Sequence, residues 1–195
     1  MKPRVSPGAL RAAIGFGPWF SVTAGGLGHM WPASGTWGSL PPALLMVSLA
    51  WTPAPGWVHM LLQLALATLA SIACVRVGDR VEQVVGRKDP GVVVIDEVAG
   101  MALTLALGLL GVAIASGGVQ RLAEPMPVTL TLAVTAGGFF WFRVMDVIKP
   151  PPARRLQAVP GGLGVIDDLV VAPFAALALL LSLEMLVRWL TPLSS

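Results

Sequence analysis

Five apolar runs occupy most of the chain beyond residue 39, and short polar or glycine- and proline-rich segments separate them. The runs are residues 40–51, 58–77, 92–116, 128–149 and 168–189. A helix needs about 20 apolar residues to cross a bilayer. The last four runs therefore predict spanning helices, the third beginning near Asp96 and the fifth kinked at Pro173. We expect an all-α fold, a polytopic membrane helical bundle of about five apolar helices with the first one short.

The first 39 residues have a different pattern. Residues 1–14 carry Lys2, Arg4 and Arg11, which is typical of a segment at the membrane interface. Residues 15–39 are rich in Gly, Pro and Trp and predict a loop at headgroup level, anchored by Trp19, Trp31 and Trp37. We therefore expect one integral membrane domain over residues 1–195, with 1–39 an N-terminal cytoplasmic or interfacial segment and 40–195 the helical bundle.

Composition supports a membrane protein and excludes several function classes. Hydrophobic residues make up 55% of the chain and charged residues 12%, against about 25% charged residues in soluble domains. The net charge of +3, divided among loops, argues against nucleic acid as a partner. One cysteine excludes an internal disulfide and a thiolate metal cluster, and two histidines leave little material for zinc.

The basic residues predict the orientation. With the N-terminus in the cytoplasm and five spans, eleven of the thirteen Lys and Arg residues fall inside, and only Arg121 and Arg188 fall outside. In this topology five acids lie at the cytoplasmic ends of spans three, four and five: Asp96, Glu97, Asp146, Asp167 and Asp168. Segments far apart in sequence therefore reach one membrane depth.

These acids suggest a cation site. A single acid at a helix start is readily explained as an N-cap, but capping needs only one residue of each adjacent pair. Like charges packed together demand counter-charge or protonation. Carboxylates without His or Cys suit a hard ion, so Mg²⁺ or Mn²⁺ is favoured over zinc.

Two cations accompany one of the acids. Arg143, Asp146 and Lys149 recur every three residues and share one helix stripe, which the prolines at 150–152 end. Snorkelling toward lipid headgroups is the alternative for such cations. Beside a magnesium site, however, they suit an anionic phosphate ester. The turn at residues 34–39 precedes a helix and could bind an anion through free N–H groups and hydroxyls.

Four motifs in order resemble one family. They are Gly35-Thr-x-Gly-Ser39, Asp96-Glu-x-x-Gly100, Phe142-Arg-x-x-Asp-x-x-Lys-Pro150 and Gly161-Gly-x-Gly followed by Asp167-Asp168. The combination resembles phosphatidylglycerophosphatase A over about residues 30–175. The resemblance implies a Mg²⁺-dependent, multi-pass enzyme of the bacterial cytoplasmic (inner) membrane, active on the cytoplasmic side. Its substrate would be the phospholipid phosphatidylglycerophosphate, which loses its terminal phosphate to give phosphatidylglycerol.

The resemblance also implies roles for residues at matching positions. The candidate catalytic residues are Asp96, Glu97, Asp146 and Asp167, and the candidate metal ligands are the same four with Asp168. The candidate phosphate contacts are Thr36, Ser39, Arg143 and Lys149. Which of Asp167 and Asp168 faces the ion stays open at this point. So does the choice between direct water attack and an aspartyl-phosphate intermediate.

Other functions are less consistent with these residues. A membrane ion or metal transporter would also gather acids in a helical bundle, but near mid-bilayer and accessible from both sides. The chain lacks the aspartate pattern of CDP-alcohol phosphotransferases, and His29 and His59 lack the setting of histidine-based lipid phosphatases. A purely structural interpretation, with acids as caps and bases as topology signals, is the remaining alternative.

Overall fold

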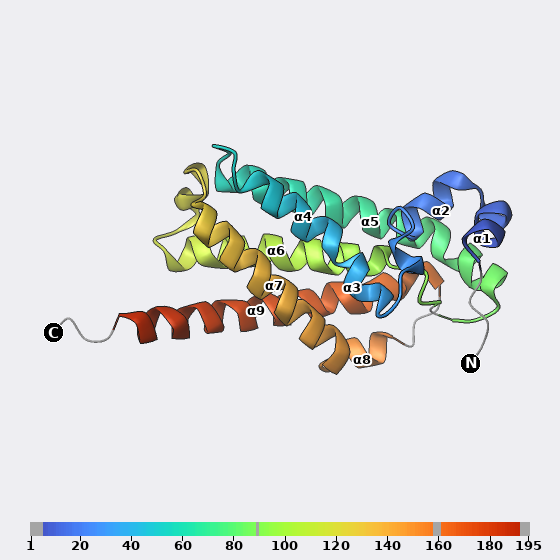
Figure 1. The fold of residues 1–195 in the computed structure, drawn as a ribbon. Helices are drawn as coiled ribbons and strands as arrows, with labels where there is room; N and C mark the ends of the chain where they lie inside the picture. Colours follow the sequence, from blue (N-terminus) through green and yellow to red (C-terminus); the bar gives the residue numbers. More distant parts are fainter. Residues whose placement is uncertain (1–5, 89, 158–160, 192–195) are drawn as a thin grey trace.

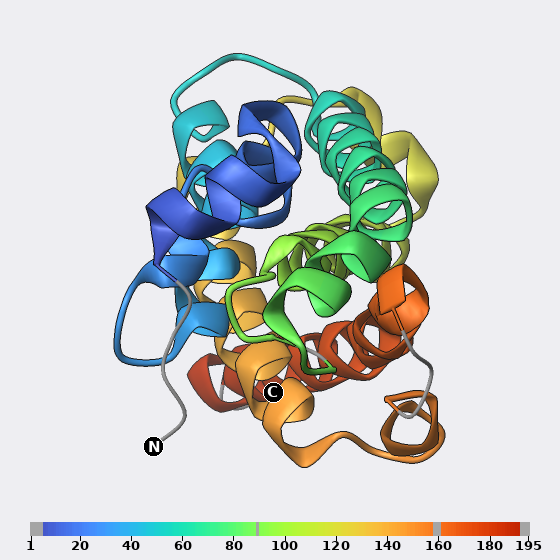
Figure 2. The same cartoon turned by 90° about the vertical axis from the view of Figure 1, so that its right-hand side faces the viewer.

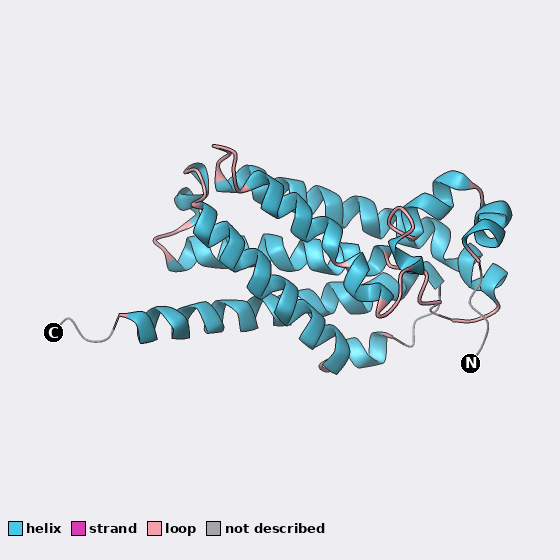
Figure 3. Ribbon diagram, in the orientation of Figure 1, coloured by secondary structure: helices cyan, strands magenta, loops and turns pink. Residues whose placement is uncertain are grey.

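The computed structural model describes residues 6–88, 90–157 and 161–191, and these residues form helices and loops without a named strand (Figures 1 and 3). Lys2 and Arg4 of the predicted interfacial segment lie outside the described residues. The helices are α1 Pro7–Ile14, α2 Phe16–Val22, η1 Leu27–His29, α3 Ser34–Gly38, α4 Leu40–Leu49, α5 Gly56–Val85, α6 Ile95–Ala115, η2 Val119–Ala123, α7 Val128–Ile148, α8 Ala153–Leu156, η3 Gly161–Gly164 and α9 Val165–Leu190.

Four of these helices are long and apolar enough to cross a membrane: α5, α6, α7 and α9. A helix of 21 residues is about 31 Å long, close to the thickness of the hydrocarbon core. The most apolar window of α6 is 61% buried, whereas those of the other three are 28% buried. Helix α6 therefore runs through the middle of the bundle, and its neighbours turn apolar sides outward. The predicted all-α membrane bundle is confirmed.

The first apolar run forms a short helix rather than a full span. Helix α4 has ten residues and packs against α5, α6 and α7. Ten residues extend about 15 Å, which is half of a bilayer core. Helix α3 precedes α4 almost without a break, and together they lie along the bundle (Figure 1).

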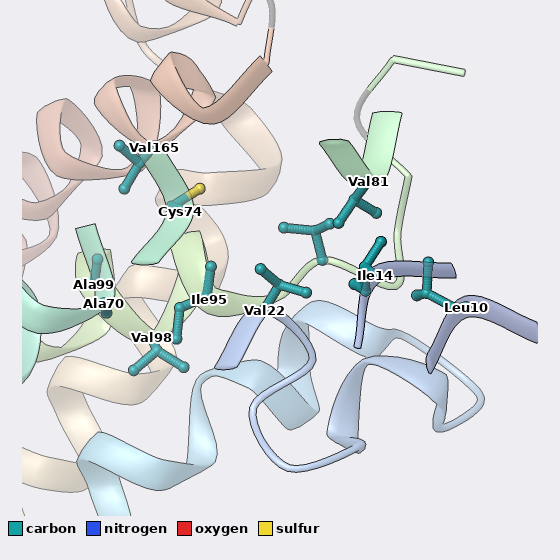
Figure 4. Packing of buried hydrophobic residues seen from close by; sticks show 11 residues of the cluster. Leu10, Ile14, Val22, Ala70, Cys74, Val81, Ile95, Val98, Ala99 and Val165 are labelled. Atoms are coloured by element: carbon teal, nitrogen blue, oxygen red, sulfur yellow. The ribbon is translucent and has the colours of Figure 1, made fainter. Parts of the chain in front are cut away.

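Two predicted boundaries were wrong. Residues 15–39 were expected to form a loop, but they contain α2, η1 and α3, and the Trp19 indole donates a hydrogen bond to His29. Helix α5 continues eight residues past the predicted end at Val77. The extra turns are held because α1 and α2 pack on α5, and Val81 is fully buried in a cluster that includes Ile14 and Leu10 of α1 (Figure 4).

The bundle places several helix ends together. Helices α6 and α9 begin at the same end of the molecule at which α7 terminates. Helices α1, α2 and α8 also lie at this end (Figures 1 and 2). Close packing holds them there, since a methyl group added at Gly100 of α6 would lie 2.7 Å from the Phe142 ring and 3.0 Å from the Asp168 side chain. This end of the bundle carries the predicted site residues.

Candidate active site

One cavity collects the acids predicted to meet. Asp96 and Glu97 lie in the first turn of α6, Asp167 and Asp168 in the first turn of α9, and Asp146 near the end of α7. All five line a cavity of about 80 Å³. Lysines 88 and 149 also line it, as does Glu82. The space is large enough for a small ion with some of its water.

Three carboxylates come closest to one another. Asp96, Glu97 and Asp168 each offer an oxygen, and these oxygens all lie within 4.8 Å of one another. Asp168 is 3% exposed, and its Oδ1 accepts no hydrogen bond among the described residues; the same holds for the buried Oε2 of Glu97. Buried carboxylate oxygens without donors are costly unless a cation meets them. The donor set therefore fits a hard divalent cation.

Asp146 lies between two cations of its own helix stripe. The Arg143 guanidinium nitrogen Nη1 lies 2.9 Å from Asp146 Oδ2, and Lys149 Nζ lies 3.3 Å from Asp146 Oδ1. The contact with Arg143 is an ion pair without hydrogen-bond alignment, since Nη1 has no hydrogen-bond acceptor among the described residues. Asp146 thus orients both cations at the cavity, and part of the donor capacity of Arg143 is unused.

Lys149 connects the end of α7 to the start of α9. Its Nζ lies 2.5 Å from Asp167 Oδ2 and 3.5 Å from Asp168 Oδ1. Its backbone has φ +45°, a left-handed conformation that costs a residue with a side chain about 1 kcal/mol or more. Burial opposes the charged form, but the carboxylates of Asp168, Asp167 and Asp146 outweigh it and raise the pKa of Lys149. Lys149 therefore stays an ammonium ion at neutral pH.

The two adjacent aspartates of α9 differ in their surroundings. Asp167 accepts hydrogen bonds from Lys149 Nζ and from the backbone N–H of Asp168. Asp168 has only the longer contact with Lys149, and its carboxylate faces Asp96 and Glu97. Of the pair left open by the sequence, Asp168 has the better position for an ion and Asp167 the better position to hold Lys149.

Helix α3 forms a wall next to these groups. A methyl group added at Gly35 would lie 2.5 Å from Glu97 Oε1 and 3.1 Å from the Arg143 guanidinium, so a side chain here would displace these groups. The fully buried Ser39 hydroxyl donates to the Gly35 carbonyl and is engaged in the wall itself. Thr36 lies with Arg143 along an outer groove. Gly35 therefore lies close to the acids, whereas the predicted phosphate contact Ser39 is engaged with the Gly35 carbonyl and the predicted contact Thr36 lines the outer groove.

Sequence reasoning missed two acids of α5. Asp79 Oδ1 accepts a 2.9 Å hydrogen bond from the Gly162 N–H, and Glu82 Oε2 accepts one of 3.1 Å from the Gly161 N–H. These bonds fix the glycine turn η3, which leads into α9 and its aspartates. The signal was a pair of acids three residues apart, but the helix had been predicted to end before them.

Comparison with known proteins identifies related sequences. The family model described as phosphatidylglycerophosphatase A matches residues 20–183. A protein of Bacteroides thetaiotaomicron, provisionally named a phosphatidylinositol-3-phosphatase, is 31% identical over 158 residues, which cover 81% of this chain and 82% of that protein. No solved structure matches the chain. The range matched by the family model includes every residue placed around the cavity.

Proposed function

This chain belongs to the phosphatidylglycerophosphatase A family, and from that premise we propose that it is a Mg²⁺-dependent phosphatase that converts phosphatidylglycerophosphate to phosphatidylglycerol and phosphate. One observation carries the proposal. Three carboxylates of α6 and α9 converge within 4.8 Å, and two lack hydrogen-bond donors at buried oxygens, directly beside Lys149. Such a group suits a divalent cation next to a phosphate.

Asp96, Glu97 and Asp168 are the residues that would hold the metal. Mg²⁺ bound there would supply positive charge to the phosphate oxygens and lower the pKa of a bound water. Asp146 and Asp167, which the resemblance also named as ligands, instead hold Arg143 and Lys149 in place. We assign them to positioning these cations, within reach of the cavity.

The cations have a separate part in the reaction. Lys149 remains charged, so it acts as an electrostatic partner for phosphoryl oxygens rather than as a base. Arg143 lies next to the cavity through its ion pair with Asp146, and its Nη1 has no hydrogen-bond acceptor among the described residues. In the proposed hydrolysis a water oxygen bonds to phosphorus while the ester P–O bond breaks. A proton from that water ends on the released headgroup oxygen, giving the alcohol and inorganic phosphate.

We propose that the reaction takes place at one surface of the membrane. The acids lie at the ends of α6, α7 and α9 that share one end of the bundle with α1 and α2 (Figure 1). Helix α1 is amphipathic, and Phe16 and Phe20 of α2 are exposed. The distribution of basic residues supports the cytoplasmic face of a bacterial inner membrane. A transporter would need such acids near mid-bilayer, and family membership also favours the phosphatase.

A second substrate follows from the Bacteroides relative. Its provisional name concerns a phosphate on an inositol headgroup, and that lipid, like phosphatidylglycerophosphate, carries a phosphomonoester beyond a phosphodiester. Phosphatidylinositol 3-phosphate is therefore the alternative to test. We favour the glycerol lipid because the family model that matches residues 20–183 is described by that activity, whereas the name of the relative is provisional.

The test measures phosphate release by the purified full-length protein in lipid nanodiscs, with each of the two lipids and with or without Mg²⁺. We expect Mg²⁺-dependent release, faster from phosphatidylglycerophosphate. Asp146→Asn and Asp167→Asn should lower the rate strongly while the protein stays in the membrane. Glu124→Gln at the opposite end is the matched control and should leave the rate unchanged. Absence of release from both lipids would contradict the proposal.

A further inference from the structure

An apolar groove lies on the outer side of the candidate active site. It is a surface groove of about 540 Å³ that is open rather than enclosed. Residues of one face of α7 form it together with Thr36 of α3: Phe139, Phe140, Arg143, Val144, Val147 and Ile148. Apart from Thr36 and Arg143 the lining is apolar, so the groove has one polar region on an otherwise hydrocarbon-like surface.

Arg143 connects the groove to the cavity, because it lines the groove and forms an ion pair with Asp146, which lines the cavity. The guanidinium is near Gly35 and contacts Asp146 on the cavity side, while the same residue lines the groove together with Thr36. An anion in the groove would therefore meet a cation and a hydroxyl only one side chain away from the acids. The ligand that fits both places has phosphate at the cavity and hydrocarbon in the groove.

The position of the groove suits entry from the bilayer. It lies along the last three turns of α7, a membrane-spanning helix, and Val147 is 77% and Phe140 57% exposed. Apolar side chains this exposed on a spanning helix face acyl chains. A lipid could thus slide laterally between α3 and α7 without leaving the membrane, and its terminal phosphate would reach the cavity at the helix end.

We infer that the groove between α3 and α7 binds an acyl chain of the phospholipid substrate and that Thr36 and Arg143, at its polar region, bind the phosphodiester next to the glycerol backbone. The identity of the lipid rests on the proposed function. The inference adds a second phosphate subsite, separate from the one at Lys149.

Turnover of two substrates tests the groove. Deacylated phosphatidylglycerophosphate has both phosphates but no acyl chains, so only the diacyl lipid should use the groove. Val147→Trp fills the groove at an exposed position, and we expect kcat/KM for the diacyl lipid to fall about tenfold, mainly through KM. The rate with the deacylated compound should not change. Equal losses on both substrates, or no loss on either, would overturn the inference.

A control and a milder variant accompany this measurement. Leu132→Trp adds the same bulk on α7, at an exposed position outside the groove lining, and should behave like the unmodified protein. Phe140→Ala removes part of the groove wall far from the acids and should weaken use of the diacyl lipid by a smaller factor. A loss with Leu132→Trp as large as that with Val147→Trp would mean that bulk on α7, not the groove, matters.

Binding gives a readout that does not need catalysis. A phosphatidylglycerophosphate with a photoreactive diazirine in one acyl chain is irradiated with the protein in nanodiscs without divalent ions. Labelling should concentrate on residues 139–148, and both unlabelled diacyl lipid and Val147→Trp should reduce it. Labelling that simply follows exposure, equally strong at Leu69 and Met185, would mean surface lipid contact only and overturn the inference. Concentrated labelling without phosphate release would instead contradict the proposed function and leave the groove assignment standing.

Discussion

The two ends of the helix bundle hold their charged residues in different ways. At the end away from the cavity, Arg121 pairs with Glu124 three residues on, and Glu184 of α9 pairs with Arg188 four residues on, and all four side chains are more than half exposed. At the cavity, ion pairs join α7 to α9 across 18 and 19 residues of sequence, and the side chains of Lys149, Asp167 and Asp168 are at most 17% exposed.

The difference shows which charges need a ligand. Exposed pairs within one helix are satisfied by water and by each other, and contribute little to stability. The cavity is lined by six acids and two lysines. Two of the acids, Glu97 and Asp168, have a buried carboxylate oxygen without a hydrogen-bond donor in the described part of the chain. Burying like charges is costly without counter-charge, so the charges at the cavity end are those that the proposed cation and phosphate would balance.

Replacing a cluster carboxylate should have the largest effect. Asp168→Asn keeps the shape of the side chain but removes one charged oxygen from the group of three, and we expect phosphate release to fall about a thousandfold. Glu124→Gln makes the same chemical change at the other end and should alter the rate less than twofold. Equal rates for the two variants would remove the distinction between the ends.

Mg²⁺ should stabilise the folded protein only by binding to the acids of the cavity. Adding Mg²⁺ to chelator-treated protein should raise Tm, because a ligand at 100 times its Kd stabilises the folded state by about 2.7 kcal/mol. The shift should be lost in Asp96→Asn and kept in Glu124→Gln. A shift that persists in Asp96→Asn would place the ion elsewhere.

Lys149 should have a large effect on the reaction and a measurable backbone effect. Removing the ammonium group in Lys149→Ala should lower phosphate release about a hundredfold, because Lys149 is the cation that contacts both Asp146 and Asp167 in the described part of the chain. Lys149→Gly should be equally inactive yet more stable than Lys149→Ala by about 1 kcal/mol, since glycine adopts φ +45° without strain. Thermal unfolding of the two variants makes the comparison; alanine at least as stable as glycine would contradict it.

Crowding at the wall of the site should give a smaller loss. Gly35→Ala places a methyl group against Glu97 and Arg143, and we expect phosphate release to fall about tenfold while the protein remains folded. Gly17→Ala is the matched control, because a methyl group there meets nothing within 4 Å. If both substitutions leave the rate unchanged, α3 does not border the site as described.

We expect the smallest effect from a substitution at the end of the bundle away from the cavity. Arg188→Ala breaks an exposed pair with Glu184 and should change the free energy of unfolding by about 0.5 kcal/mol or less. Phosphate release should be unaffected. A loss of activity here would show that charge on both ends of the bundle matters, and the comparison would fail.

The sequence predicted the helical bundle and the meeting of the acids, because apolar length and the depth of charged residues depend on local pattern. It missed the end of α5, where packing of α1 and α2 rather than apolar length keeps residues 78–85 helical. It also could not separate Asp167 from Asp168. That distinction depends on where Lys149 reaches from the end of α7, a contact between distant segments.

The central claim is that Asp96, Glu97 and Asp168 together hold one divalent cation. The most direct measurement is a titration of the purified protein with Mn²⁺, a paramagnetic substitute for Mg²⁺ at oxygen sites, followed by electron paramagnetic resonance. We predict one saturable site that Mg²⁺ displaces and that Asp168→Asn abolishes. Binding of Mn²⁺ to Asp168→Asn with unchanged affinity and stoichiometry would contradict the account.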